Sequence, residues 1–68
     1  MSTQPLPPFA LVRLISDAYG KYGLKIGDEG VIVDVYGDEA YEVDFTDSEG
    51  NPITFVAVKQ GDVELVKP

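Results

Sequence analysis

The sequence of 68 residues contains no cysteine, no histidine and no tryptophan. Without cysteine, neither disulfide bonds nor thiolate-bound metals can reinforce the core. Without histidine and cysteine, the side chains that most often serve as general base and thiol nucleophile are missing. The remaining carboxylates, hydroxyls and lysines stand in no motif that would activate them. We therefore expect a protein that is not an enzyme and has no small-molecule substrate.

A metal site is also not expected. Hard oxygen ligands occur in the order D-x-x-D-x-E-G-N, at Asp44, Asp47, Glu49 and Asn51. This spacing does not match the calcium-binding loop D-x-[DN]-x-[DN]-G-x₅-E, in which glycine holds the sixth position. An ordinary hairpin turn rich in acceptors explains the segment, so we expect no metal and no cofactor.

Long apolar runs are missing as well. No segment approaches the roughly 18 residues of a membrane span. The first residues, MSTQPLPP, lack the basic and apolar regions of a signal peptide. A small secreted domain would usually carry disulfides. We expect a single soluble domain in the cytoplasm with no membrane association.

Positive charge is scarce: five Lys and Arg stand against 12 Asp and Glu, for a formal net charge of −7. Phosphate backbones and anionic membranes are met with Lys and Arg, so direct nucleic-acid binding is disfavoured. A basic protein partner would be attracted, with faster association at low salt. The alternative is that the charge only keeps a small domain soluble.

The pattern of apolar residues predicts an all-β domain. Residues 1–8 form a proline-containing flexible N-terminal arm with no structure of its own, and residues 9–67 form one domain. Residues 16–28 contain three glycines and predict a long loop rather than a helix. The expected strands are 9–15, 29–36, 40–46, 52–58 and 62–66.

Five short strands cannot form two full sheets, but they can close into a small barrel. The order of one strand, a long loop, a three-stranded meander, a short turn and a last strand predicts a five-stranded SH3-like barrel. Whether Val31 or Ile32 faces the core stays open, because a bulge after Gly30 would switch the phase. The predicted inward residues are Val12, Leu14, Val33, Val35, Tyr41, Val43, Phe45, Ile53, Phe55, Val63 and Leu65.

Carboxylates fall on the outer face of the second and third predicted strands. Two registers keep the valines in phase, and they set Asp34 opposite either Glu42 or Asp44. Either register pairs two carboxylates across strands, which is unfavourable by a fraction of a kcal/mol. Asp38 and Glu39 add charge at the turn. These five residues are a candidate site for a basic partner, unless they simply extend into screened solvent.

The loop supplies a weaker candidate surface. Tyr19, Lys21 and Tyr22 combine aromatic and cationic character, as residues at the centres of protein interfaces do. Loop tyrosines in small barrels also fold back onto the core, and we expect Tyr22 to do so because so short a chain assembles little core.

The segment Leu24-Lys25-x-Gly27-Asp28-x-Gly30-Val31-Ile32-Val33, followed by Val35-Tyr36 and residues 40–45, resembles a family of small bacterial proteins of unknown function. The resemblance covers about residues 10–66 and implies an SH3-like barrel. The Gly-Asp-x-Gly turn is also similar to that of KOW modules in ribosomal and transcription proteins. Those modules present Lys and Arg where this chain carries acidic residues. No activity follows from the resemblance, since fold alone does not supply one.

Together these observations predict a non-catalytic, monomeric protein-binding module with an acidic strand face. An antitoxin, an immunity-type inhibitor or a small accessory subunit would fit this description. The alternative is a KOW-like module held in a ribonucleoprotein or transcription complex through protein contacts. A third hypothesis is a structural domain that is normally fused to a larger chain.

Overall fold

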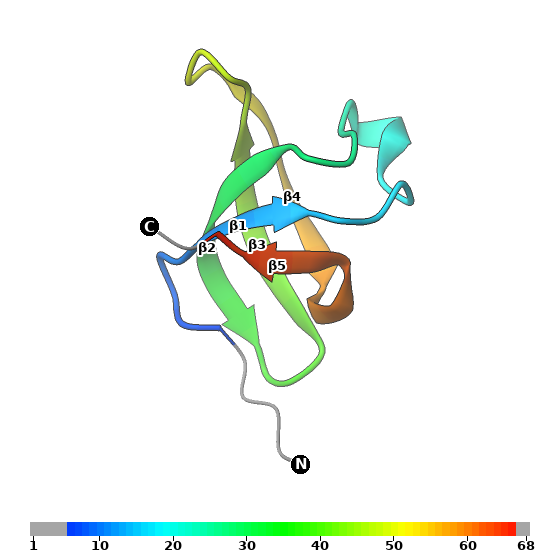
Figure 1. Ribbon diagram of the computed structural model, residues 1–68. Coiled ribbons are helices and arrows are strands. Elements are labelled where there is room, and N and C mark those ends of the chain that lie inside the picture. Colours follow the sequence, from blue (N-terminus) through cyan, green and yellow to red (C-terminus); the bar gives the residue numbers. More distant parts are fainter. Residues whose placement is uncertain (1–5, 67–68) are drawn as a thin grey trace.

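The computed structural model describes residues 6–66 and confirms an all-β domain (Figure 1). The five strands lie within two residues of their predicted bounds. Each of the two short 3₁₀ helices, η1 and η2, is a single turn. The elements are β1 (Leu11–Leu14), η1 (Gly20–Tyr22), β2 (Glu29–Tyr36), β3 (Ala40–Thr46), β4 (Pro52–Lys59), η2 (Gln60–Asp62) and β5 (Val63–Leu65).

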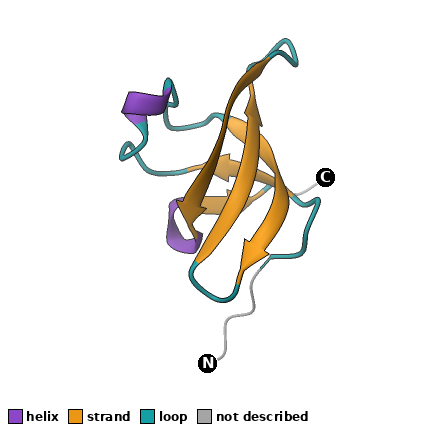
Figure 2. Ribbon diagram, turned by 180° about the vertical axis from the view of Figure 1, so that it is seen from behind, coloured by secondary structure: helices purple, strands orange, loops and turns teal. Residues whose placement is uncertain are grey.

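All five strands belong to one antiparallel sheet with the order β4-β3-β2-β1-β5. Of the residues of β2, only the first three pair with β1, whereas β3 pairs along the whole length of β2. The sheet therefore bends within β2, and β1 and β5 run across the direction of β3 and β4 (Figures 1 and 2). The bend lets one sheet enclose a core.

The core is built from alternate residues of the strands, together with two residues of the long loop. The sheet can fold tightly here because Gly30 has no side chain: a Cβ at this position would lie 2.7 Å from both the Asp44 carbonyl oxygen and Val43 Cγ1. The buried residues are Val12, Leu14, Tyr19, Leu24, Ile32, Tyr41, Val43, Phe45, Val58 and Val63.

Two irregularities in strand pairing correct the predicted inward set. Between Ile32 and Asp34 the register of β2 shifts, so that Ile32 is fully buried and Val33, predicted to face the core, lies in the irregularity and is only half-buried. A second shift, between Phe45 and Thr46, changes the phase of β4. Phe55 is consequently 60% exposed on the outer face rather than buried.

A further correction concerns the ends of the described chain. Leu65 is predicted to face the core but is exposed, because it is the last residue of β5, the strand at the edge of the sheet. Leu6 lies in the predicted free arm, yet it packs against the core and its backbone N–H donates to the Tyr41 hydroxyl at 2.8 Å. The rest of the predicted arm, residues 1–5, lies outside the described residues.

Candidate functional site

The predicted acidic residues follow the β2–β3 hairpin. We call Asp34, Asp38, Glu39, Glu42 and Asp44 the acidic face. Of the two registers that the sequence allows, the structure has the one that sets Asp34 opposite Glu42. The irregularity at Val33 produces this register, since it keeps both Ile32 and Val35 on the side of the core. Two carboxylates thus stand side by side on adjacent strands.

Local hydrogen bonds hold both members of this pair. The backbone N–H of Val35 donates to Asp34 Oδ1, and the Tyr36 hydroxyl donates to Glu42 Oε1, each at 2.8 Å. The hydrogen bond to the Glu42 carboxylate raises the pKa of Tyr36 above its ordinary value. Both carboxylates are therefore held by hydrogen bonds from residues of the same hairpin. The part that Tyr36 plays in this was not predicted from the sequence.

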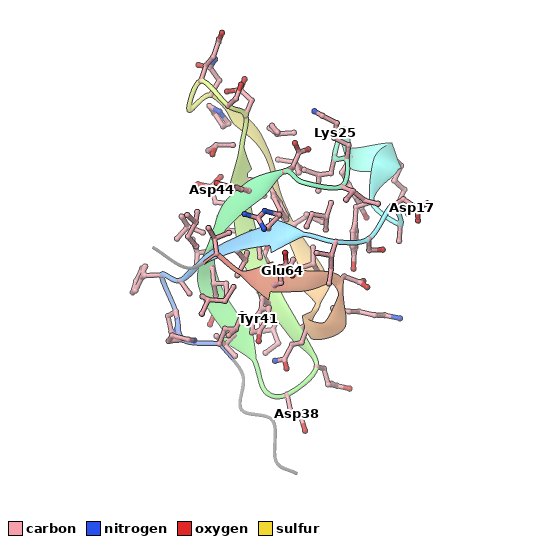
Figure 3. All side chains as sticks on the ribbon, in the orientation of Figure 1. Asp17, Lys25, Asp38, Tyr41, Asp44 and Glu64 are labelled. Carbon is pink, nitrogen blue, oxygen red and sulfur yellow. The ribbon has the colours of Figure 1, made fainter. Side chains whose placement is uncertain are left out.

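The remaining acidic residues spread along the hairpin rather than meeting at one point. Asp38 and Glu39 lie in the turn between β2 and β3 and are exposed. Figure 3 shows Asp38 at this end of the molecule and Asp44 well away from it along β3. The acidic face is therefore an elongated strip of separate carboxylates.

Two cations of the described chain, Arg13 and Lys25, pair with carboxylates outside the acidic face. Arg13 Nη1 and Nη2 contact Glu64 and Glu29 at 3.0 and 3.7 Å, and Lys25 contacts Asp28 at 3.4 Å. Within residues 6–66, none of the ion pairs involves the acidic face. Its negative charge is consequently left for solvent or for a partner.

A row of exposed apolar residues crosses the outer surface and passes through Asp44 of the acidic face. Leu11 pairs with Val31, Val31 with Asp44, and Asp44 with Phe55, so these four residues form one line across β1, β2, β3 and β4. Leu11, Val31 and Phe55 are 41%, 37% and 60% exposed. The row was not predicted from the sequence, because a phenylalanine in an apolar strand is expected to lie in the core. Asp44 is therefore flanked by apolar surface on both sides.

The loop candidates separate into one buried residue and two exposed ones. Tyr19 is only 8% exposed, and its hydroxyl donates to Asp62 Oδ2 at 2.5 Å and accepts from the Lys59 backbone N–H at 3.0 Å. It fastens the loop to η2 and the end of β4, so Tyr19 and not Tyr22 caps the core. Tyr22 is 41% exposed, and Lys21 Nζ lies 5.3 Å from its ring centre. Lys21 and Tyr22 are therefore on the surface of the loop.

Two surface hollows accompany these features. The larger, of about 420 Å³, lies between the starts of β1 and β2 and the β3–β4 turn, and the smaller, of about 360 Å³, lies beside Leu6 and η2. Neither is lined by a residue of the acidic face. In the part of the chain that the structure describes, no group of three or more acidic residues is arranged to hold a metal ion, and no helix could span a membrane.

Comparison with known proteins gives one match. A family model described as a domain of unknown function, DUF4926, matches residues 9–65, which is most of the chain. No curated protein and no solved structure matches significantly.

Proposed function

We propose that this chain, which belongs to the DUF4926 family of domains of unknown function, is a non-catalytic protein-binding module that presents its acidic face to a basic protein. The observation that carries the proposal is the direct pairing of Asp34 with Glu42 on adjacent strands, without a cation of the described chain bound to either. Like charges directly opposite each other are unfavourable. A basic partner would relieve this repulsion.

The arrangement of the surface supports a protein as the partner. The strip of carboxylates lies next to exposed Val31 and Phe55, so charged and apolar contacts are offered together. Protein interfaces combine an apolar centre with a polar rim. Nucleic-acid-binding strands would need cations here, where this chain has Asp34, Glu42 and Asp44.

The bent five-stranded sheet, with η2 between β4 and β5, supports an SH3-like barrel as the scaffold for this surface. In this proposal the protein acts in the bacterial cytoplasm as an antitoxin, an immunity-type inhibitor or a small accessory subunit. Each of these roles requires a soluble module that covers a basic surface on another protein, and opposite charge would speed their association.

The experiment is capture of partners from a native lysate with the tagged chain and with the double variant Asp34→Lys/Glu42→Lys. We expect the wild-type chain to capture a specific basic protein in a salt-sensitive manner and the variant to lose it. Equal capture of the same protein by both forms would contradict the acidic-face proposal. Salt-sensitive binding of plain RNA by the wild-type chain would contradict the choice of a protein partner.

A further inference from the structure

The outer edge of β4 is an unpaired strand edge. Strand β4 is the last strand on its side of the sheet, and only β3 pairs with it. From Pro52 to Val58 it carries no charged residue. Natural sheets usually protect such edges with charges, bulges or very short strands, because an open edge is a template for another strand. In β4, Pro52, the register shift near Ile53 and Lys59 lie towards the two ends of the strand, so residues 54–58 between them lack this protection.

The hydrogen bonds at the end of β4 show which backbone groups face the open edge. The N–H of Gln60 donates to the carbonyl of Glu39, towards β3, whereas the N–H of Lys59 donates to the Tyr19 hydroxyl, away from β3. Backbone groups of an antiparallel strand alternate between the two sides. The register is regular from Thr54 to Lys59, so the N–H and C=O groups of Ala57 and Phe55 also face the open edge. Tyr19 occupies this edge at Lys59.

The side chains beside this edge identify the occupant. Phe55 and Ala57 lie on the outer face, and their partners on β3 are Asp44 and Glu42. Because Ala57 is small and exposed, a long side chain on an added strand can cross it towards Glu42. A second copy of the chain would bring another −7 charge to the same place, which is unfavourable.

We propose that β4 accepts an extended, basic segment of a partner protein as an additional antiparallel strand, bonded to the backbone of Phe55 and Ala57 with its Lys or Arg side chains over Asp44 and Glu42. This inference rests on the proposed function and specifies how the basic partner is held. Main-chain hydrogen bonds provide affinity in this mode, and alternate side chains provide specificity.

The geometry predicts which peptide amides matter. Directly opposed residues of paired strands point to the same face, and residues opposite Phe55 and Ala57 exchange hydrogen bonds with them. In a peptide of alternating lysine and valine, the residues opposite Phe55 and Ala57 are therefore the lysines. Lysine amides face β4, and valine amides face away.

The test uses a capped heptapeptide of alternating lysine and valine, titrated into the ¹⁵N-labelled full chain at low salt. We expect saturable binding, with shifts and slowed exchange at the Phe55 and Ala57 amides. N-methylation of the lysine amides should weaken binding at least about tenfold, whereas N-methylation of the valine amides should leave it within about threefold. The protein variant Ala57→Pro should weaken binding as much as N-methylation of the lysine amides does. It removes an N–H that faces the open edge and breaks no hydrogen bond to β3. The control variant Ala57→Ser should bind the peptide normally.

Three outcomes would overturn the proposal. No saturable binding of the parent peptide is the first, and equal effects of the two methylation patterns is the second. In the second case, if the variant Asp34→Lys/Glu42→Lys no longer binds the peptide, the acidic face still binds basic partners. Only the proposal that the partner adds as a strand to β4 is then wrong. The third is dimerisation of the free chain in sedimentation that Ala57→Pro abolishes, which would assign the edge to a second copy.

Discussion

The Tyr36 hydroxyl donates a hydrogen bond to Glu42 Oε1 at 2.8 Å, and Glu42 stands opposite Asp34 in the pairing of β2 with β3. The hairpin thus contains a donor of its own for one of two adjacent carboxylates. A phenol compensates part of the repulsion but adds no positive charge. This arrangement keeps the negative charge of the acidic face intact, which a lysine at position 36 would not do.

Removal of the Glu42 charge should be detectable at Tyr36. The pKa of Tyr36 is raised first by the hydrogen bond to Glu42, so we expect Glu42→Gln to lower it towards the ordinary value of 10.0. The ¹³Cζ chemical shift of Tyr36 followed through an alkaline titration measures this directly. An unchanged Tyr36 titration in the variant would show that the two side chains do not interact in solution.

Tyr19→Phe should destabilise the fold. The variant keeps the ring in the core but removes the hydroxyl that joins Lys59 to Asp62. A lost hydrogen bond of this kind costs about 1 kcal/mol of unfolding free energy. Urea unfolding at neutral pH measures it, with exposed Tyr22→Phe as the matched control. Equal stability of the Tyr19→Phe variant and the wild type would contradict the role given to Tyr19.

The same residue predicts a loss of stability in alkali. Burial, and then the hydrogen bond to Asp62, raise the pKa of Tyr19 in the folded state above 10.0. Its contribution to stability is therefore complete below that pH and is lost as the pH rises through the folded-state value. The difference in unfolding free energy between the wild type and Tyr19→Phe should therefore become smaller as the pH rises above 10.0. A difference that stays constant would show that Tyr19 ionises equally in both states.

Gly30→Ala should be the most damaging of the glycine-to-alanine changes. A Cβ at Gly30 would lie 2.7 Å from backbone of β3, which cannot move without disturbing the sheet. We expect a loss of about 1–3 kcal/mol in urea unfolding, typical of overpacked sites. At Gly61 a Cβ would meet nothing within 4 Å, so Gly61→Ala is the control and should change stability little. Similar losses in both variants would contradict the close approach.

Asp47 should make the β3–β4 turn sensitive to acid. Its Oδ1 accepts from the backbone N–H of Asn51 and of Glu49, at 2.8 and 2.9 Å, and these bonds, that of Asn51 first, lower the pKa of Asp47 below 3.8. A lowered folded-state pKa adds stability above 3.8 that is lost as the pH falls through the folded-state value. The stability advantage of the wild type over Asp47→Ala should therefore be present at neutral pH and shrink in strong acid. A constant advantage would exclude the carboxylate charge as its source.

The positions of the strands along the chain could be predicted from the sequence, because apolar and polar residues alternate in segments such as residues 40–46. The phase within β2 and β4 could not be predicted. Each contains one irregularity, at Val33 and near Ile53, and a single inserted residue moves every later side chain to the other face. For this reason the alternation in the sequence predicts Phe55 in the core, whereas it is exposed.

The acidic face could be predicted in part. The opposition of Asp34 to a carboxylate follows from the phase of the neighbouring valines, and the structure selects Glu42. The contribution of Tyr36 and the burial of Tyr19 in place of Tyr22 depend on how side chains are directed in three dimensions. Both tyrosines of the loop have similar neighbours in the sequence, so no local signal distinguishes them.

The most direct test of the central claim compares two double variants with the same change in charge, measured as affinity for the captured partner. Asp34→Lys/Glu42→Lys alters the acidic face, while Asp17→Lys/Glu49→Lys places the same charges on the long loop and the β3–β4 turn. If the acidic face binds the partner, the first variant should lose at least about tenfold in affinity and the second should stay within about threefold of the wild type. Equal losses in the two variants would show that only the net charge matters, and would contradict a binding face on the β2–β3 hairpin.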